Sequence, residues 1–355
     1  MKSGRSLVEL ARELERQLGT KKDLLVPLPR THHCTAEDGK CVLEIQEPDG
    51  VQRYGITALA RRQLAEKLKI PYAYFERMRT EQPELLDRNV NAWLSNEEGE
   101  RQLLRTLDGQ VRAVLSERYR RLDNHDLVEH VVPALQALPE ARFESVELTE
   151  KRLYLKVVSP RIEFEVAPGD VVQAGVVVSN SEVGCGMLSV QPLVFRLVCR
   201  NGLIASDKSL RKQHVGRALD SEQASGVVFK DDTLQADDRA FFLRVRDTVA
   251  AAVSEATLRT LGEKLRKTRE LWVAGDPVKS VEVLAQRHAL TDGERSGVLR
   301  SLFEGGELTG YGLVNAVTRY AQQAPDYDRA TELEALGGRL AEQRASEWEA
   351  LLASK

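Results

Sequence analysis

Residues 188–204, LSVQPLVFRLVCRNGLI, carry the strongest strand signal in the chain and end in a turn signal. With a period of two residues, valine and arginine alternate on one face: Val194, Arg196, Val198 and Arg200. The opposite face is apolar: Leu193, Phe195, Leu197 and Cys199. Asn201-Gly202 tolerates positive φ, so we expect the chain to reverse there into Leu203-Ile204. The stretch therefore predicts an antiparallel strand with one core face and one arginine-bearing face.

Basic side chains accumulate around this strand and the segment after it. Residues 194–217 hold six basic side chains against one acidic side chain, Asp207. Three of the six follow the turn closely: Lys208, Arg211 and Lys212. Two interpretations stay open, because the arginines can form the solvated face of an antiparallel strand or part of a polyanion-binding face.

The composition is that of a soluble globular protein. The chain has 355 residues, enough for two compact domains or one large domain with a helical appendage, and a net charge of −3. No apolar run approaches 18 residues, and the N-terminus has amphipathic helical spacing instead of a secretory apolar region. Four cysteines are too few for a disulfide framework at this length. We expect a cytoplasmic protein with reduced thiols that does not associate with a membrane.

The order of patterns predicts an α+β fold. Turn signals at 48–50 and 108–109 separate alternating segments and indicate two hairpins, over 41–56 and 102–116. Short strands over 142–148, 152–158, 161–166 and 171–179 join 188–199 in a broad, mostly antiparallel sheet, with the helices of 57–138 packed on one face. Helical spacing dominates the C-terminal third. We expect a core domain over 1–205, a flexible connection over 206–232 and a helical region over 233–355.

The sequence contains one local group of potential zinc ligands: His32, His33, Cys34 and Cys41. A structural zinc site needs about four nitrogen or sulfur ligands. Adjacent residues rarely point at one ion, and no second ligand pair with zinc-like spacing accompanies them. A polar surface loop is the favoured interpretation of this segment, and a zinc site is the alternative.

Two further segments are locally basic. Residues 53–79 hold seven basic and two acidic residues in a helix-turn-helix-like arrangement, which fits a structural helical hairpin, a phosphate-contacting surface or a base-reading helix. Before the next helix, three arginines surround a tyrosine: Arg118, Tyr119, Arg120 and Arg121. Arginines can contact phosphates while a tyrosine offers a stacking surface for bases, so this segment is a candidate nucleic-acid site.

Three stretches resemble the phage/plasmid-like proteins of the domain-of-unknown-function 932 family. They are VLSERYRRLDN at 114–124, FRLVCRNGL at 195–203 and YGLVNAVT at 311–318, and the helix around 62–65 and 70–71 fits too. The chain departs from the family pattern within 180–186, where Glu182-Val183-Gly184 stands in place of an Asp-Gly before the long strand. The resemblance supplies no enzymatic activity, but the family's usual setting implies a role in mobile-element DNA metabolism.

We therefore expect a non-enzymatic protein that binds single-stranded DNA in recombination, annealing or replication, with no cofactor and with self-association into an oligomer. The expected contacts are Arg118, Tyr119, Arg120, Arg121, Arg196, Arg200, Lys208, Arg211 and Lys212. No nucleotide-loop, nucleophile-elbow or metalloprotease motif is present. The alternatives are an oligomeric interaction protein without nucleic-acid affinity and a metal-dependent nuclease that uses Asp231-Asp232 and Asp237-Asp238.

Overall fold

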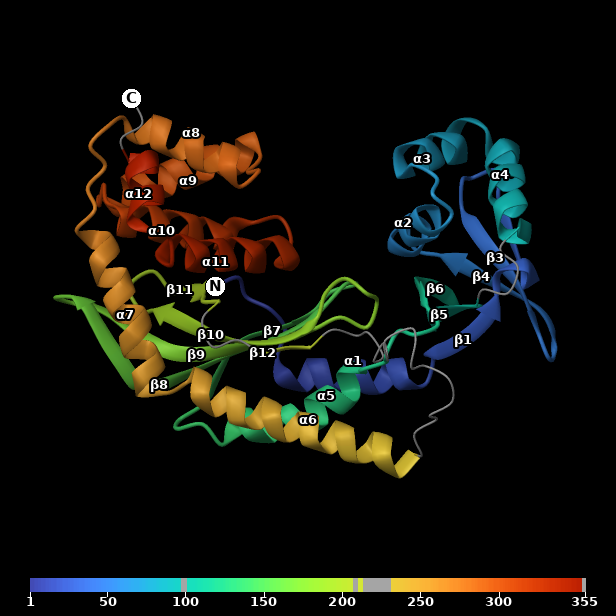
Figure 1. Ribbon diagram of the computed structural model, residues 1–355, viewed down its shortest axis with the longest axis horizontal. Coiled ribbons are helices and arrows are strands. Elements are labelled where there is room, and N and C mark those ends of the chain that lie inside the picture. Colours follow the sequence, from blue (N-terminus) through green and yellow to red (C-terminus); the bar gives the residue numbers. More distant parts are fainter. Residues whose placement is uncertain (97–100, 207–209, 213–230, 353–355) are drawn as a thin grey trace, which may run out of the picture.

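A computed structural model describes residues 1–96, 101–206, 210–212 and 231–352 (Figure 1). Its elements confirm the α+β class, with two mostly antiparallel sheets and a helical C-terminal region. The strands are β1 (Lys22–Pro27), β2 (Thr31–Thr35), β3 (Cys41–Glu47), β4 (Gly50–Ile56), β5 (Arg101–Leu107), β6 (Gln110–Ser116), β7 (Arg142–Leu148), β8 (Leu153–Ala167), β9 (Asp170–Asn180), β10 (Leu188–Arg196), β11 (Asn201–Ile204) and β12 (Leu210–Lys212).

The helices divide between the two sheets and the C-terminal region (Figure 1). Those of the N-terminal half are α1 (Leu7–Leu18), α2 (Ala58–Lys67), α3 (Tyr72–Glu81), α4 (Pro83–Asn96) and α5 (Asn124–Gln136). Those of the C-terminal region are α6 (Asp231–Ala252), α7 (Glu255–Arg269), α8 (Pro277–Arg287), α9 (Asp292–Gly305), α10 (Gly310–Tyr320), α11 (Tyr327–Ala341) and α12 (Ala345–Leu352). The expected connection over 206–232 lies largely outside the described residues.

The first sheet has the strand order β1-β5-β6-β4-β3-β2 and contains both predicted hairpins. In the second of them, Asp108 and Gly109 both have positive φ, as the tight turn between β5 and β6 requires. Helices α2, α3 and α4 cover one face with apolar side chains that include Leu64, Phe75 and Val90. The hairpins thus form a sheet of their own, separate from the broad sheet expected over 142–199. The prediction that all the helices of 57–138 pack on that broad sheet is wrong for α2, α3 and α4, because their apolar side chains cover the hairpin sheet.

Helix α4 holds the edge strand β2 in place. The Asp87 carboxylate accepts hydrogen bonds from the Thr35 amide and hydroxyl and contacts His33 Nδ1 at 2.8 Å. The Asn91 side chain accepts a hydrogen bond from the His33 amide and donates one to the His33 carbonyl. The backbone of an edge strand otherwise lacks partners. Residues 31–35 therefore form a strand, and the expected surface loop is wrong for this segment.

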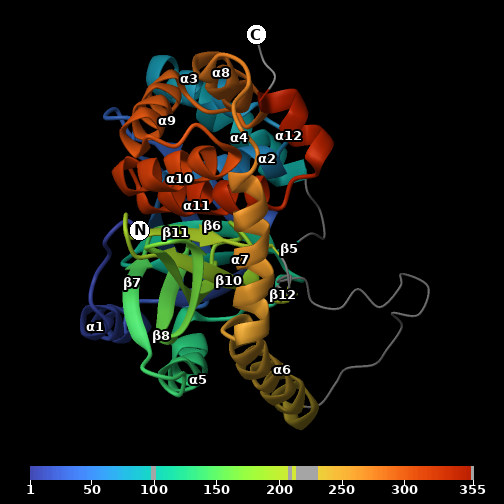
Figure 2. The same ribbon diagram turned by 90° about the vertical axis from the view of Figure 1, so that its left-hand side faces the viewer.

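The second sheet has the order β11-β10-β9-β8-β7, with β12 paired to β10 beside β11. Helices α1, α5 and α6 lie on one face, and α11 lies on the other (Figures 1 and 2). Leu10, Leu127 and Phe241 pack on the first face, whereas Leu193 and Phe195 pack on the face toward α11. The central strands are buried on both faces for this reason.

Two strand boundaries differ from those predicted. Strand β10 ends at Arg196, the turn occupies residues 197–200, and Asn201 already pairs with Arg196. Gly202 lies in β11, where a Cβ would approach Leu193 Cδ1 at 3.0 Å, so this glycine provides close packing instead of the turn. Strand β8 also runs through Pro160 without a break, because an irregularity in its pairing between Ser159 and Glu163 accommodates the proline.

Candidate functional site

Polar residues gather at both ends of strand β9. Asp170 and Asn180 are the first and last of its 11 residues, roughly 33 Å apart in an extended chain. The segment after Asn180, residues 181–187, joins β9 to β10 and meets the first sheet. We call this segment the junction loop.

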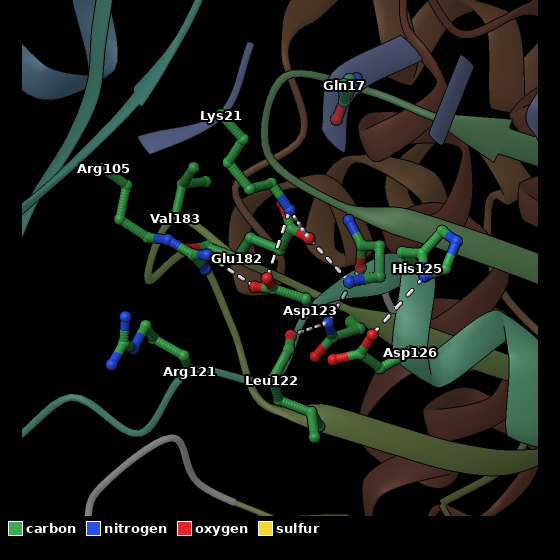
Figure 3. Close-up of polar contacts among 12 residues, drawn as sticks. Gln17, Lys21, Arg105, Arg121, Leu122, Asp123, His125, Asp126, Glu182 and Val183 are labelled. Atoms are coloured by element: carbon green, nitrogen blue, oxygen red, sulfur yellow. Dashed lines mark hydrogen bonds and ion pairs between the residues drawn. The ribbon is translucent and has the colours of Figure 1, made fainter. Parts of the chain in front are cut away.

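The Glu182 carboxylate is the centre of the junction loop. It is 2% exposed and accepts hydrogen bonds from Lys21 Nζ at 2.8 Å, from the Asn124 amide at 2.6 Å and from Arg112 Nη2. Lys21 precedes β1, Arg112 lies on β6, and Asn124 begins α5. Figure 3 shows Lys21 and Glu182 directed at each other between these elements. One side chain therefore connects the first sheet to a helix on the second.

Arg105 extends the same network. Its side chain is fully buried, bridges the carboxylates of Asp23 and Asp123, and donates to the Glu182 carbonyl at 3.1 Å. Three cations and three carboxylates are thus brought together at the junction: Lys21, Arg105, Arg112, Asp23, Asp123 and Glu182. Their charges balance, which allows ionised groups to be buried.

The carbonyl groups of the junction loop bind side chains from several elements. Tyr119 donates to the Ser181 carbonyl at 2.9 Å, Gln63 of α2 donates to the Val183 carbonyl at 2.8 Å, and Arg152 donates to the Cys185 carbonyl. The Ser181 hydroxyl accepts the amide hydrogens of Val183 and Cys185. The loop is consequently held both through its backbone carbonyl groups and through the side chains of Ser181 and Glu182.

Neighbouring cations keep the carboxyl group of Glu182 ionised. Burial alone raises the pKa of Glu182, but Arg112 and Lys21 outweigh burial and lower this pKa to about 2. A carboxylate with so low a pKa is a weak proton acceptor at neutral pH. The network is therefore better suited to joining the two sheets than to proton transfer.

The predicted basic segment at residues 118–121 lies beside the junction loop. Arg118 and Arg121 are exposed, and Arg120 is half-buried. Arg121 contacts Asp23 at 3.3 Å, whereas Arg118 has no ion pair within the part of the chain that the structure describes. The Tyr119 ring packs against a buried cluster of Leu103, Leu115 and Val183, and its burial raises the pKa of the phenol. This tyrosine contributes to the junction itself.

The other predicted arginines lie at the opposite end of β9. Arg196 binds Asp170 through two hydrogen bonds of 2.7 Å, and its guanidinium lies 5.4 Å from the centre of the Tyr311 ring. Arg200 is in the turn, has positive φ, and pairs with Glu144 at 3.0 Å. Because β10 ends at Arg196, the two arginines do not share a strand face as predicted. The two ends of β9 also keep Arg196 apart from Arg118.

Some of the predicted DNA contacts and nuclease carboxylates belong to residues whose side chains the structure does not describe. Lys208 lies outside the described residues, and for Arg211 and Lys212 the structure describes only the backbone, which pairs with Ser189 and Leu188 of β10. The carboxylates proposed for a nuclease belong to the first residues of α6, whose side chains are likewise not described: Asp231, Asp232, Asp237 and Asp238.

The possible zinc ligands are spread over two strands. His33 is fully buried against Asp87, while its neighbours His32 and Cys34 are more exposed, as the alternation of a strand dictates. Cys41 on β3 lies opposite Thr35. Among the described residues, no three His, Cys, Asp or Glu side chains are grouped as metal ligands.

Exposed cations surround the junction loop. Arg62 adjoins Gln63, Arg118 adjoins Tyr119, and Lys151 adjoins Arg152, so each is the sequence neighbour of a side chain bonded to the loop. Arg62 lies over the Tyr72 ring at 4.8 Å. A hollow of about 330 Å³ opens beside Arg112, Lys151 and Glu182. None of Arg62, Arg118, Lys151 and Arg152 has an ion pair with a carboxylate in the described ranges.

Sequence patterns did not reveal the members of the buried network. Arg105 and Arg112 are isolated charges in segments whose clearest pattern is apolar alternation, and Lys21 belongs to the short charged run Lys21-Lys22-Asp23. One signal was present, since Glu182-Val183-Gly184 is the place where the chain departs from the family pattern. That departure now coincides with the residues that join the two sheets.

Comparison with protein families identifies the class of protein. Residues 111–345 match the family described as Domain of unknown function (DUF932), from β6 through the first residue of α12. The chain belongs to the DUF932 family. Comparison with curated proteins and with solved structures gives no match. Among the described helices, none is both long and apolar enough to span a bilayer.

Proposed function

We propose that this protein binds single-stranded DNA without catalysing a reaction, through the cations around the junction loop. The observation that carries the proposal is the contrast among its basic side chains. Arg61 and Arg79 share Glu76, and Arg196 is bound by Asp170, whereas Arg62 and Arg118 remain exposed without a carboxylate partner among the described residues. Exposed cations without a carboxylate partner are available to phosphates, and binding then releases counterions from the DNA.

The distribution of these cations favours a DNA strand over a small anion as the ligand. The unpaired cations come from α2, from the segment before α5 and from the turn before β8, so they are distributed around the loop instead of converging on one point. A flexible polyanion can contact distributed cations in succession. The role we propose is in recombination, annealing or replication of a mobile element, in the cytoplasm, with several copies of the chain acting together.

Fluorescence anisotropy of labelled single- and double-stranded 30-mers, titrated over a range of salt concentrations, tests this function. In the triple variant Arg62→Ala, Arg118→Ala, Lys151→Ala, we expect weaker binding of single strands. The negative slope of log affinity against log salt should become shallower by about 2, since each lost phosphate contact on a single strand removes about 0.7 from its magnitude. A separate Arg200→Ala variant examines the other end of β9.

The matched control removes three exposed arginines that already have carboxylate partners: Arg77, Arg161 and Arg246. This control changes the net charge equally and should leave the salt slope unchanged. Equal losses in both triple variants would contradict the proposed site. If the unmodified protein binds neither DNA form at low salt, the proposed function is wrong, and its size in solution then tests the alternative of an oligomeric interaction protein. Cleavage that depends on Mg²⁺ would indicate the nuclease.

A further inference from the structure

A second pocket lies between the second sheet and helix α11. It has a volume of about 260 Å³ and is lined from the sheet by Ser179, Ser189 and Gln191 and from α11 by Leu336 and Arg339. We infer that this pocket binds a small phosphorylated ligand, no larger than a nucleoside monophosphate. The inference rests on side chains other than those of the DNA-binding proposal, apart from Arg152, which also donates to the junction loop.

The floor of the pocket is polar where packing predicts apolar residues. Ser179 on β9 and Ser189 on β10 are directly opposite in register, and their hydroxyls are 2.9 Å apart. Both are nearly buried, although their neighbours on the same sheet face, Val177 and Leu193, belong to the apolar core. The pair lies where β9 ends and β10 begins, and a serine there offers less apolar contact than the valine or leucine found further along the same face. The two hydroxyls are suited to hydrogen-bond a polar ligand.

Positive charge on the walls exceeds the negative charge available to neutralise it. Arg329 is bound by Glu294 and Glu332. Arg339 is exposed and has no ion pair in the portion of the chain that the structure describes, and Arg152 binds only backbone and hydroxyl groups there. An anion that enters the pocket can therefore bind Arg152 and Arg339 without displacing a carboxylate.

Two further observations define the ligand more closely. His288 also lines the pocket, and its pKa is lowered by burial, by Arg339 and by Arg287, as expected where cations gather. Leu290, Leu333 and Leu336 form an apolar wall beside these polar groups. A nucleotide matches these groups: its phosphate can bind the arginines, its sugar hydroxyls can hydrogen-bond the serines, and its flat base can pack against the leucines. The volume excludes a much larger ligand.

Isothermal titration calorimetry with the full chain tests the pocket. The probes are dAMP, inorganic phosphate and deoxyadenosine, which lacks the phosphate. We expect dAMP to bind at least about tenfold more tightly than deoxyadenosine, because charge-assisted hydrogen bonds to the phosphate are lost in the nucleoside. Arg339→Ala should weaken dAMP binding at least about tenfold, and Arg339→Lys should weaken it less.

Arg259→Ala provides the matched control, since Arg259 is an exposed arginine on α7 that does not line the pocket. It should leave dAMP affinity unchanged, and circular dichroism should show that all variants fold. The inference is wrong if neither phosphate nor dAMP binds. It is also wrong if Arg339→Ala and Arg259→Ala lose the same amount of dAMP affinity. Displacement of dAMP by a dT30 strand assigns the bound phosphate to DNA, and no displacement assigns it to a free nucleotide. Both of these results support the pocket, and the Arg339 variants test it without changing Arg62, Arg118 or Lys151 of the DNA-binding proposal.

Discussion

At the scale of single residues, Glu182 shows how a buried charge determines the response to pH. Its pKa is about 2 in the folded protein against an ordinary value of 4.5. The unfolded chain therefore binds more protons between about pH 5 and pH 2, and stability falls as the pH drops through this window. The shift corresponds to about 3 kcal/mol of stability at neutral pH.

The Glu182→Gln variant tests this contribution. It leaves Lys21, Arg105 and Arg112 with one carboxylate fewer, so we expect a loss of about 3 kcal/mol at pH 7 and a weaker dependence of stability on pH between 5 and 2. Urea denaturation at several pH values measures both effects. Glu150→Gln, at an exposed glutamate, should change neither. An unaltered acid profile in Glu182→Gln would show that other carboxyl groups set the pH dependence.

The sequence distance between interacting residues explains which site residues could be predicted. Composition and spacing located Arg118 and Arg196 as basic residues, but an arginine in a strand looks alike whether solvent or a carboxylate faces it. Asp170, the partner of Arg196, lies 26 positions earlier, and Glu182 lies 77 positions from Arg105. No local period links residues so far apart, so the partners appear only when the chain has folded.

At the scale of elements, the junction loop depends on the backbone of Gly184. This residue has a φ of +76°, and a Cβ there would lie 2.7 Å from Leu115 Cδ2. We expect Gly184→Ala to destabilise the protein by about 1–3 kcal/mol, because the alanine is strained in this conformation and displaces Leu115. Urea denaturation measures the loss, and hydrogen exchange at the Val183 and Cys185 amides should become faster.

Gly293→Ala is the matched control for that substitution. Gly293 is in helix α9, and a Cβ added there would meet no atom within 4 Å, so alanine should be neutral or stabilising at this position. If Gly184→Ala is as stable as the unmodified protein and its loop amides exchange at the same rate, the loop does not need this glycine.

Elements were predictable where turn chemistry is local. The hairpin over β5 and β6 follows from Asp108-Gly109 and the alternation on either side. The end of β10 did not follow from Asn201-Gly202, because both residues serve tertiary contacts: Asn201 donates to Thr318 of α10, and Gly202 allows close approach of Leu193. A turn signal is thus reliable only where no packing contact competes for the same residues.

At the scale of the whole molecule, the α+β class followed from the order of strand and helix patterns, but the division into two sheets did not. Strands β1 and β5 are far apart in sequence, and their antiparallel pairing places Asp23 opposite Arg105. The pairing therefore sets two members of the buried network side by side. Sheet membership is a property of such long-range pairing, which alternation within one strand does not encode.

The family match begins at residue 111, inside β6, and this leads to a prediction about the chain as a whole. A fragment of residues 111–345 lacks Lys21, Asp23 and Arg105, so Asp123 loses Lys21 and Arg105, and Glu182 loses Lys21 while it keeps Arg112. It also lacks Leu10 and Leu14 of α1, and Trp348 of α12, which pack in the core of the second sheet. Unpaired buried charges and missing core side chains each cost several kcal/mol, comparable with the total stability of a protein.

We therefore expect the 111–345 fragment to lack a cooperative unfolding transition in urea and to bind the dye ANS, while the full chain unfolds cooperatively. Supplying residues 1–110 as a separate polypeptide should restore part of the transition, because that segment carries Lys21, Arg105 and five of the six strands of the first sheet. A fragment that unfolds cooperatively on its own would show that the family region is an independent domain. The junction would then be a docking surface between two domains instead of part of one folding unit.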